Sequence, residues 1–84
     1  MFENCKYIYF RKVDVQKKIG ILIGRFRKQN GWSQEDLAEL TGFHPDYIGK
    51  IERGERAPSL KTLLKIIDKL KVRYSVFFKE LEEN

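Results

Sequence analysis

Cysteine and histidine are almost missing from this 84-residue chain, which contains one of each, Cys5 and His44. A single cysteine excludes an intramolecular disulfide framework and favours a reducing compartment. One cysteine and one histidine also provide no cluster of metal ligands, so no metal site is predicted. Nothing in the sequence resembles a Ser/His/Asp set, a catalytic carboxylate pair or a glycine-rich phosphate loop. These absences predict a protein that is not an enzyme and needs no cofactor.

Long apolar runs are missing as well. The longest lies around residues 19–23, and Gly20 interrupts it, whereas a membrane span needs about 20 predominantly apolar residues. Glu3 and Arg11 fall where a signal peptide would need an apolar stretch. We therefore expect a cytoplasmic protein with no membrane partner, and no domain for a small-molecule ligand is evident.

The composition is that of one small folded domain. Apolar residues make up 42% and aromatic residues 13% of the chain, which is enough for a core and excludes a disordered tail. A domain of this size buries only about 60% of the surface that its unfolded chain exposes. A partner subunit would therefore add useful stability.

Positive charge is in excess, with 17 Lys and Arg against 12 Asp and Glu, a formal net charge of +5. The excess lies in residues 1–30, which hold eight basic and two acidic residues, while residues 31–84 hold nine and ten. A basic protein favours a polyanionic partner, although charge alone does not identify it.

Apolar spacing predicts helices along most of the chain, and therefore an all-α fold. The first helix is expected to begin at Asp14 as N-cap and to end at Asn30-Gly31, where glycine suits a left-handed cap. We therefore divide the chain into an N-terminal extension, residues 1–13, whose structure the sequence leaves open, and a domain of residues 14–84.

Two short helices are expected next. Ser33 and Asp36 have capping-box spacing at the start of the second helix, which Gly42 ends. His44 is the expected N-cap of the third helix, and Pro45 occupies its first position, where a missing N–H costs nothing. The predicted inner faces of these two helices consist of Leu37, Ala38, Leu40, Thr41, Ile48 and Ile51.

Two amphipathic helices complete the prediction. Ser59 caps the fourth, whose expected inner residues are Leu60, Leu63, Leu64, Ile67 and Leu70. The fifth is expected at about residues 75–81 and carries Val76, Phe77, Phe78 and Leu81.

Residues 34–53 have the spacing of a helix-turn-helix. Two helices that cross steeply after a three-residue turn need a small residue at the crossing, which Ala38 provides. The turn needs a residue that tolerates positive φ, which Gly42 provides, and the second helix needs an apolar anchor, which Ile48 provides.

The chain also resembles a family, the Xre/Cro-type helix-turn-helix regulators of phages and bacteria. The resemblance covers about residues 19–81 and is carried by Ile19-Gly20, Arg25–Arg27, Gly31–Ala38, Tyr47–Gly54 and Pro58–Leu60. It implies a compact five-helix, repressor-like domain that binds double-stranded DNA, with its second and third helices as the helix-turn-helix. The small size and the Phe77-Phe78 pair are most similar to controller proteins of restriction–modification systems; phage-type repressors and antitoxin-type regulators are the alternatives.

The resemblance implies a recognition helix at about residues 45–53. Family members read base edges from the positions that are Pro45, Asp46, Gly49 and Lys50 here. Lys50 could donate to guanine and Asp46 could accept from cytosine, whereas Pro45 and Gly49 have no hydrogen-bonding side chain, which favours shape readout or a thymine-methyl contact. The expected phosphate contacts are Ser33, Gln34, Tyr47, Arg53, Arg56 and Lys61. The resemblance also implies a structural ion pair between Arg27 and Glu52.

Dimerisation is expected because one recognition helix covers few base pairs, and specificity usually comes from two half-sites about 34 Å apart. The last predicted helix offers more apolar side chains than it can bury in its own domain. The predicted homodimer interface therefore consists of Val76, Phe77, Phe78 and Leu81.

One alternative function is a protein-interaction module that keeps the helix-turn-helix scaffold but no longer reads DNA. It is favoured by the charge of residues 44–56, where three basic and three acidic side chains give a net charge of zero. Measuring the salt dependence of DNA binding separates the two functions, because each phosphate contact steepens it.

Overall fold

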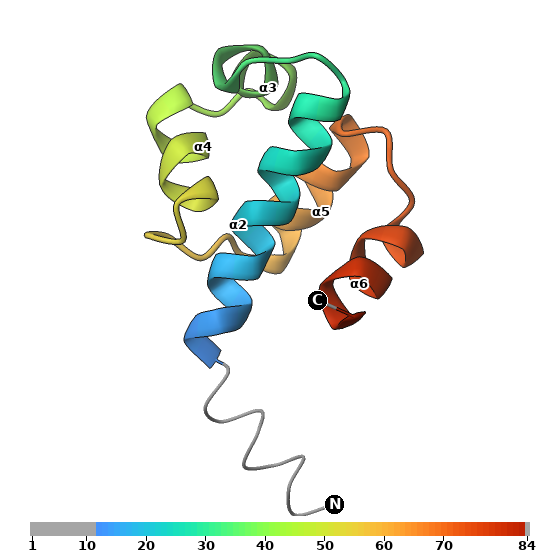
Figure 1. The fold of residues 1–84 in the computed structure, drawn as a ribbon. Coiled ribbons are helices and arrows are strands. Elements are labelled where there is room, and N and C mark those ends of the chain that lie inside the picture. The colour runs from blue at the N-terminus through green and yellow to red at the C-terminus, as the bar shows by residue number, and fades with distance from the viewer. Residues whose placement is uncertain (1–11, 84) are drawn as a thin grey trace, which may run out of the picture.

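The computed structural model describes residues 12–83, which form five helices and no strand. They are α2 (Lys12–Gln29), α3 (Gln34–Thr41), α4 (Pro45–Glu52), α5 (Leu60–Lys69) and α6 (Tyr74–Glu83). In Figure 1, α2 runs through the middle of the molecule, with α4 on one side, α6 on the other, and α5 behind. The predicted all-α, five-helix fold is confirmed for these residues.

Helix α2 is longer at its start than the sequence suggested. It is already helical at Lys12, so Asp14 lies inside the helix, and its prediction as N-cap is wrong. No glycine or proline precedes Asp14 in this stretch, and nothing local therefore stops the helix there. Residues 1–11 of the predicted extension lie outside the described residues.

The ends of α3 form as the local sequence predicts. The Ser33 hydroxyl accepts a hydrogen bond from the Asp36 N–H at 3.0 Å, and the Asp36 carboxylate accepts one from the Ser33 N–H at 2.8 Å. Gly42 ends the helix at φ 79°, and its N–H donates to the Ala38 carbonyl at 2.8 Å. Both the capping box and the glycine stop are confirmed.

Helix α4 follows after a connection of only three residues. His44 Nδ1 accepts from the Asp46 N–H at 3.1 Å, and Pro45 occupies the first turn. The chain leaves α4 through Gly54, at φ 75°. These short, well-capped ends fix where the outer face of α4 begins and stops.

All five described helices contribute to one core. It consists of Leu22, Ile23, Leu37, Ala38, Ile48, Ile51, Leu63, Ile66, Ile67, Leu70 and Phe77. Two predicted inner residues are exposed, Leu40 by 44% and Leu60 by 67%, and a third, Leu64, is only partly buried against the core. Leu60 is the first residue of α5, beyond the packed turns, and Leu40 lies off the buried stripe of α3. Ile66, which the sequence reading omitted, is fully buried.

Phe77 corrects the predicted dimer interface. Its side chain is 0% exposed, and its ring centre lies 5.9 Å from that of Phe26 on α2. Phe77 therefore belongs to the core of its own subunit and cannot touch a partner. An ion pair between Arg25 of α2 and Glu80 also joins α6 to the rest of the domain.

Within residues 12–83, no helix combines the length and apolar character that crossing a membrane requires.

Candidate nucleic-acid interface

Helix α4 is seated on the backbone of α2. A Cβ atom on Gly20 would lie 2.6 Å from the carbonyl oxygen of Glu52 and even closer to that of Ile51. Real Cβ atoms do not approach backbone this closely, so only glycine fits. Gly24, one turn later, faces the Glu52 side chain, with its Cβ position 3.2 Å from Oε1. The two glycines let the last turn of α4 rest directly on α2.

Arg27 and Glu52, the predicted structural pair, are brought together where α2, α3 and α4 meet. Arg27 Nε donates to Glu52 Oε2 at 2.7 Å, and Nη2 donates to Oε1 at 3.0 Å. The remaining Nη1 donates to the Trp32 carbonyl at 2.7 Å. The side chains are 9% and 10% exposed. Hydrogen bonding to Glu52 raises the pKa of Arg27, with the nearby carboxylate charge adding to the effect.

Gln34 joins this network. Its Nε2 donates to Glu52 Oε1 at 3.0 Å, so one carboxylate accepts from α2 and from α3 while lying at the end of α4. The side chain of Gln34, a residue predicted to contact phosphate, is therefore partly used inside the protein. The backbone of Gln34 remains at the N-terminus of α3, where free N–H groups favour anions.

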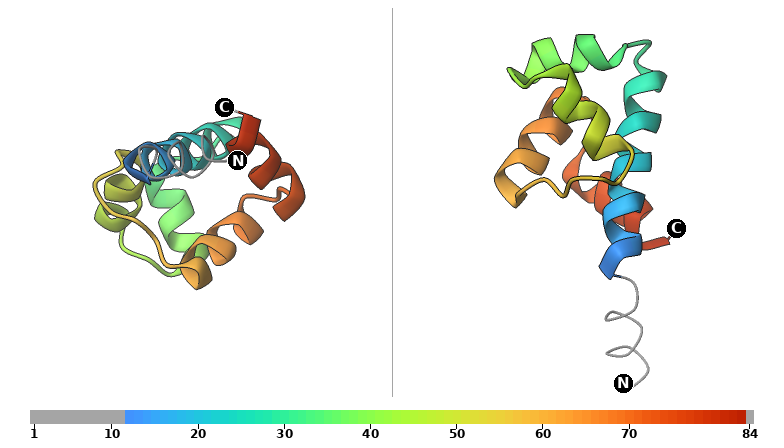
Figure 2. Two further views of the ribbon diagram at one scale, coloured as in Figure 1. Left: turned by 90° about the horizontal axis from the view of Figure 1, so that it is seen from below. Right: turned by 90° about the vertical axis from the view of Figure 1, so that its left-hand side faces the viewer.

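The outer face of α4 carries the predicted base-reading residues. Asp46 and Lys50 are exposed, Pro45 is half-buried, and Gly49 is buried. Gly49 is covered by the ends of two side chains: a Cβ placed there would lie 3.0 Å from Arg53 Nη1 and 3.4 Å from Gln34 Oε1. The right-hand view of Figure 2 looks onto the side of the molecule that carries α4.

Arg53 and Glu55 form an exposed pair at the end of α4. Arg53 Nε donates to Glu55 Oε2 at 2.8 Å, and Nη2 donates to Oε1 at 3.3 Å. Hydrogen bonds from Arg53 lower the pKa of Glu55, and those to Glu55 raise the pKa of Arg53. Both groups therefore stay ionised. Sequence reasoning did not single out Glu55; its only signal was an acid two residues after a basic helix end.

The remaining candidate phosphate contacts are spread around this face. The Arg56 guanidinium lies 5.4 Å from the ring centre of half-buried Tyr47, and that ring meets Phe43 edge-on at 5.4 Å. Lys61 is exposed in the first turn of α5, and exposed Ser33 caps α3. The structure thus brings Tyr47 and Arg56 together, and it places the side-chain ends of Gln34 and Arg53 against Gly49.

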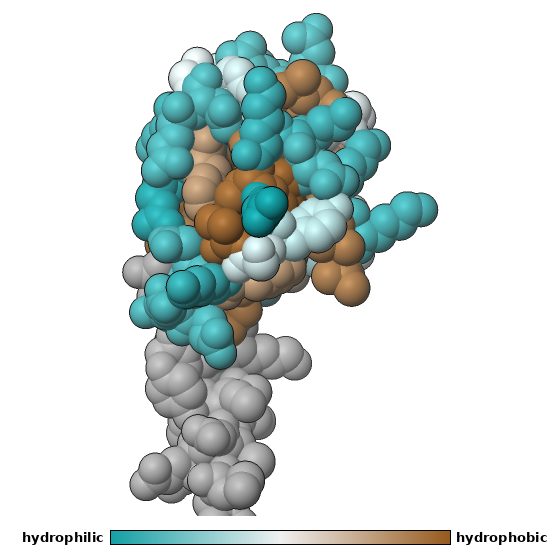
Figure 3. All heavy atoms as spheres, turned by 90° about the vertical axis from the view of Figure 1, so that its right-hand side faces the viewer, coloured by the Kyte–Doolittle hydropathy of each residue, from teal (hydrophilic) through white to brown (hydrophobic). Residues whose placement is uncertain are grey.

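Two of the predicted interface residues on α6 remain exposed, Val76 at 43% and Phe78 at 36%. Leu81 is half-buried and packs against the core. Figure 3 shows the side of the molecule that carries α6, where hydrophobic surface lies among hydrophilic side chains. Among residues 12–83, no three His, Cys, Asp or Glu side chains are grouped to hold a metal ion.

Comparison with known proteins agrees with this geometry. A family model described as "Helix-turn-helix" matches residues 23–77. The transcriptional regulator SutR of Escherichia coli K12 is 45% identical over 53 residues, which cover 63% of this chain and 30% of that protein. Control protein C.SmaI of Serratia marcescens is 40% identical over 52 residues, which cover 62% of each. The chain thus spans less than two thirds of the length of these two relatives.

A solved structure matches more completely. The restriction–modification controller protein C.Esp1396I, a tetramer in complex with its natural 35 base-pair operator, superposes with a TM-score of 0.77 at 35% identity. The match covers 82% of this chain and 91% of that one.

Proposed function

Because the chain belongs to the helix-turn-helix family, we propose that it is a sequence-specific, double-stranded DNA-binding transcriptional regulator. The observation that carries the proposal is the arrangement of α4. Its inner side rests on α2 through glycine, while Asp46, Lys50 and Arg53 stay exposed on its outer side. A helix held in this way can enter the major groove without disturbing the core.

Base readout is assigned to the outer face of α4. Lys50 donates to guanine, and Asp46 accepts from cytosine N4. Pro45 makes close apolar contact, which suits a thymine methyl group or groove shape. Gly49, which is buried beneath Arg53 and Gln34, contributes through the space that it leaves for them. The same face is flanked by the residues assigned to phosphate contacts: Ser33, Gln34, Tyr47, Arg56 and Lys61. Arg53 is included with them because its side chain is positively charged.

We further propose that two copies bind two half-sites of one operator, and that the protein works in the cytoplasm, where that operator lies. Controller of a restriction–modification system is the type of regulator that we favour. The likeness to C.SmaI and C.Esp1396I supports it. A methyltransferase gene and an endonuclease gene beside this one would be the expected genomic setting, and an adjacent toxin gene would speak against it.

Salt dependence tests DNA binding directly. Affinity for duplex DNA from the protein's own promoter should fall linearly on a log–log plot against salt, with a slope of roughly −0.9 for each phosphate contacted. Promoter DNA should also be preferred over random duplex. If no promoter fragment binds even at low salt, the protein-interaction function would replace this one.

Replacing Lys50 by alanine should remove the preference at one base-pair position. Loss of a good base contact costs about 1–3 kcal/mol of discrimination, because the guanine acceptors lose their donor. Selection of bound duplexes from a random library, run for the wild type and the variant, measures the effect position by position.

Lys69→Ala is the matched control for this change, because Lys69 is an exposed lysine on α5. It should leave the selected sequence unchanged. Equal preference profiles for the wild type and Lys50→Ala would remove Lys50 from the base-reading set.

Self-association is expected to depend on Phe78. We expect the wild type to have twice the chain mass of 10.0 kDa by light scattering, and Phe78→Asp to have the chain mass alone. A charge at this position would be buried without a partner at an apolar interface. Leu40→Asp, which alters an exposed leucine on α3, should remain dimeric. A wild type that is monomeric at micromolar concentration would contradict the proposed dimer.

A further inference from the structure

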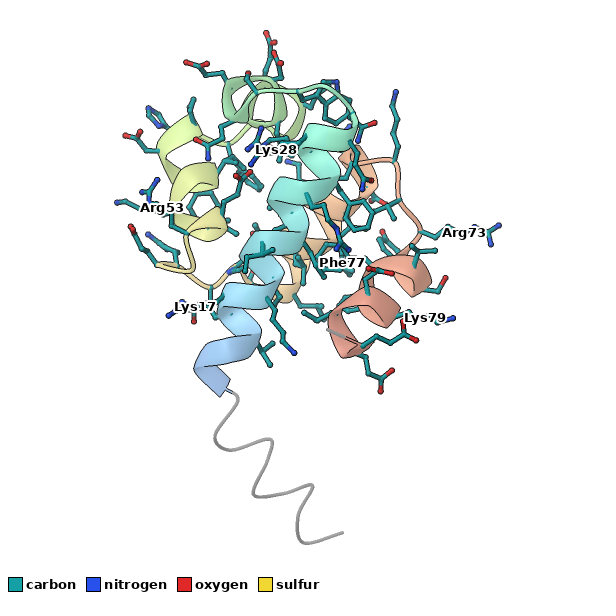
Figure 4. All side chains as sticks on the ribbon, in the orientation of Figure 1. Lys17, Lys28, Arg53, Arg73, Phe77 and Lys79 are labelled. Atoms are coloured by element: carbon teal, nitrogen blue, oxygen red, sulfur yellow. The ribbon has the colours of Figure 1, made fainter. Side chains whose placement is uncertain are left out.

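Arg53 lies along the outer face of α4 and covers its centre. Side chains on a helix lean toward its N-terminus, so residue 53 reaches over residue 49. Because Gly49 has no side chain, the guanidinium fills that space, with Nη1 3.0 Å from the position of a Cβ. Figure 4 shows Arg53 on the side of α4 that is turned away from α2. Arg53 therefore lies where residue 49 would otherwise meet a base.

Glu55 fixes the orientation of this guanidinium. Its two oxygens take hydrogen bonds from Nε at 2.8 Å and from Nη2 at 3.3 Å, which is the fork-to-fork geometry of a bidentate pair. A guanidinium has five N–H donors in one plane. Two of them are engaged by Glu55, so both hydrogens of Nη1 and one of Nη2 remain. One hydrogen of Nη1 and the remaining hydrogen of Nη2 point side by side from the terminal edge of the guanidinium.

That remaining edge matches guanine. In the major groove, guanine presents two acceptors side by side, O6 and N7, and a bidentate arginine is its commonest specific partner. A phosphate needs no such orientation, because it accepts from a cation in many geometries. A carboxylate that neutralises Arg53 would also weaken a purely electrostatic phosphate contact.

We infer that Arg53, oriented by Glu55 over the bare backbone of Gly49, reads a guanine, and that Glu55 is a positioning residue for sequence specificity. This inference rests on the proposed DNA-binding function. It replaces the assignment of Arg53 to a phosphate, and it explains how a recognition helix with glycine at a reading position still places a donor there.

Arg53→Lys tests the inference because it keeps the charge and removes the fork. A base reader loses about 10- to 100-fold discrimination at one guanine position, whereas a phosphate contact keeps its affinity and its salt slope. Selection from a random duplex library, combined with binding in a salt series, measures both. An unchanged preference profile for Arg53→Lys would overturn the inference.

Glu55→Gln distinguishes a base-reading Arg53 from a phosphate-binding Arg53. If Glu55 positions Arg53, preference at the same guanine position should fall several-fold, while affinity for random duplex rises because a negative charge is gone. If Arg53 only binds phosphate, affinity should rise equally for all sequences and the profile should stay intact. Glu82→Gln, which removes an exposed charge on α6, is the matched control and should change neither.

Gly49→Ala adds a steric test without altering charge. The new Cβ would lie 3.0 Å from Arg53 Nη1, so the guanidinium must move while the backbone stays in place. Preference at the guanine position that Arg53→Lys affects should fall, with unchanged circular dichroism. Loss at a different position would contradict the inference. A wild type that shows no sequence preference would instead refute the proposed function, and the two failures are therefore distinguishable.

Discussion

Replacing Glu52 by leucine should lower the free energy of unfolding by about 3–5 kcal/mol, the usual cost of removing one partner of a buried ion pair. Arg27 would keep its bond to the Trp32 carbonyl but would lose both hydrogen bonds to the carboxylate. A small domain has only about 5–15 kcal/mol of stability in total. Urea unfolding followed by circular dichroism measures the loss, and Arg27→Ala should also lower the melting temperature.

The double variant Arg27→Met with Glu52→Leu measures how much of the loss comes from the interaction between the two side chains. An apolar pair of similar volume often matches a buried ion pair in stability, so the double variant should be much more stable than the sum of the single changes predicts. Additive losses would contradict a coupled pair.

The pair between Arg25 and Glu80 is the natural control, since its side chains are 41% and 38% exposed. Exposed pairs contribute about 0–1 kcal/mol, and Glu80→Leu should therefore cost far less than Glu52→Leu.

Replacing Gly20 by alanine is the second change with a large expected effect. The added Cβ would overlap the carbonyl oxygens of Ile51 and Glu52, and these are backbone atoms that no rotamer change can move. Overpacking costs about 1–3 kcal/mol and occasionally more, and we expect the upper end. Alanine regains about 1 kcal/mol in helix propensity. A net loss of about 2 kcal/mol corresponds to a melting temperature about 10 °C lower.

Two other substitutions in α2 provide smaller expected losses of stability for comparison. Gly24→Ala places its Cβ against the Glu52 side chain, which can yield slightly, so the loss should be smaller than for Gly20. Lys28→Ala, on the exposed side of the helix, should change stability by less than about 0.5 kcal/mol. Equal stability of Gly20→Ala and the wild type would show that α2 and α4 do not meet at this glycine.

Local signals in the sequence predicted most of the helix ends, because their causes lie within a few residues. Ser33 and Asp36 satisfy each other across three positions, and Gly42 and Gly54 adopt the left-handed backbone that side chains disfavour. Periodicity was less reliable at the edges of helices. Leu60 has the right spacing, but the first residue of a helix has less neighbouring structure to bury it.

The errors and omissions at the candidate site have tertiary causes. The sequence marked Phe77 and Phe78 alike, and only the packing against Phe26 shows which one is internal. Similarly, the sequence shows no side chain at position 49 that could contact a base, and only the structure shows that the Arg53 side chain covers this position. Gln34 was predicted as a phosphate contact, and nothing in the sequence indicates that its side chain donates to Glu52 of another helix.

The way α4 is seated has a consequence for how such a protein changes its target during evolution. At Gly20, what α2 touches at the end of α4 is main chain, the carbonyl groups of residues 51 and 52, and main chain is common to all sequences; the one side chain of α4 that α2 binds there, Glu52, lies inside the protein. Outer residues such as Asp46, Lys50 and Glu55 are exposed, so substituting them should change the preferred operator at little cost in folding. A new binding specificity is thus accessible through a few substitutions on one surface, while the packing of α4 against α2 stays the same.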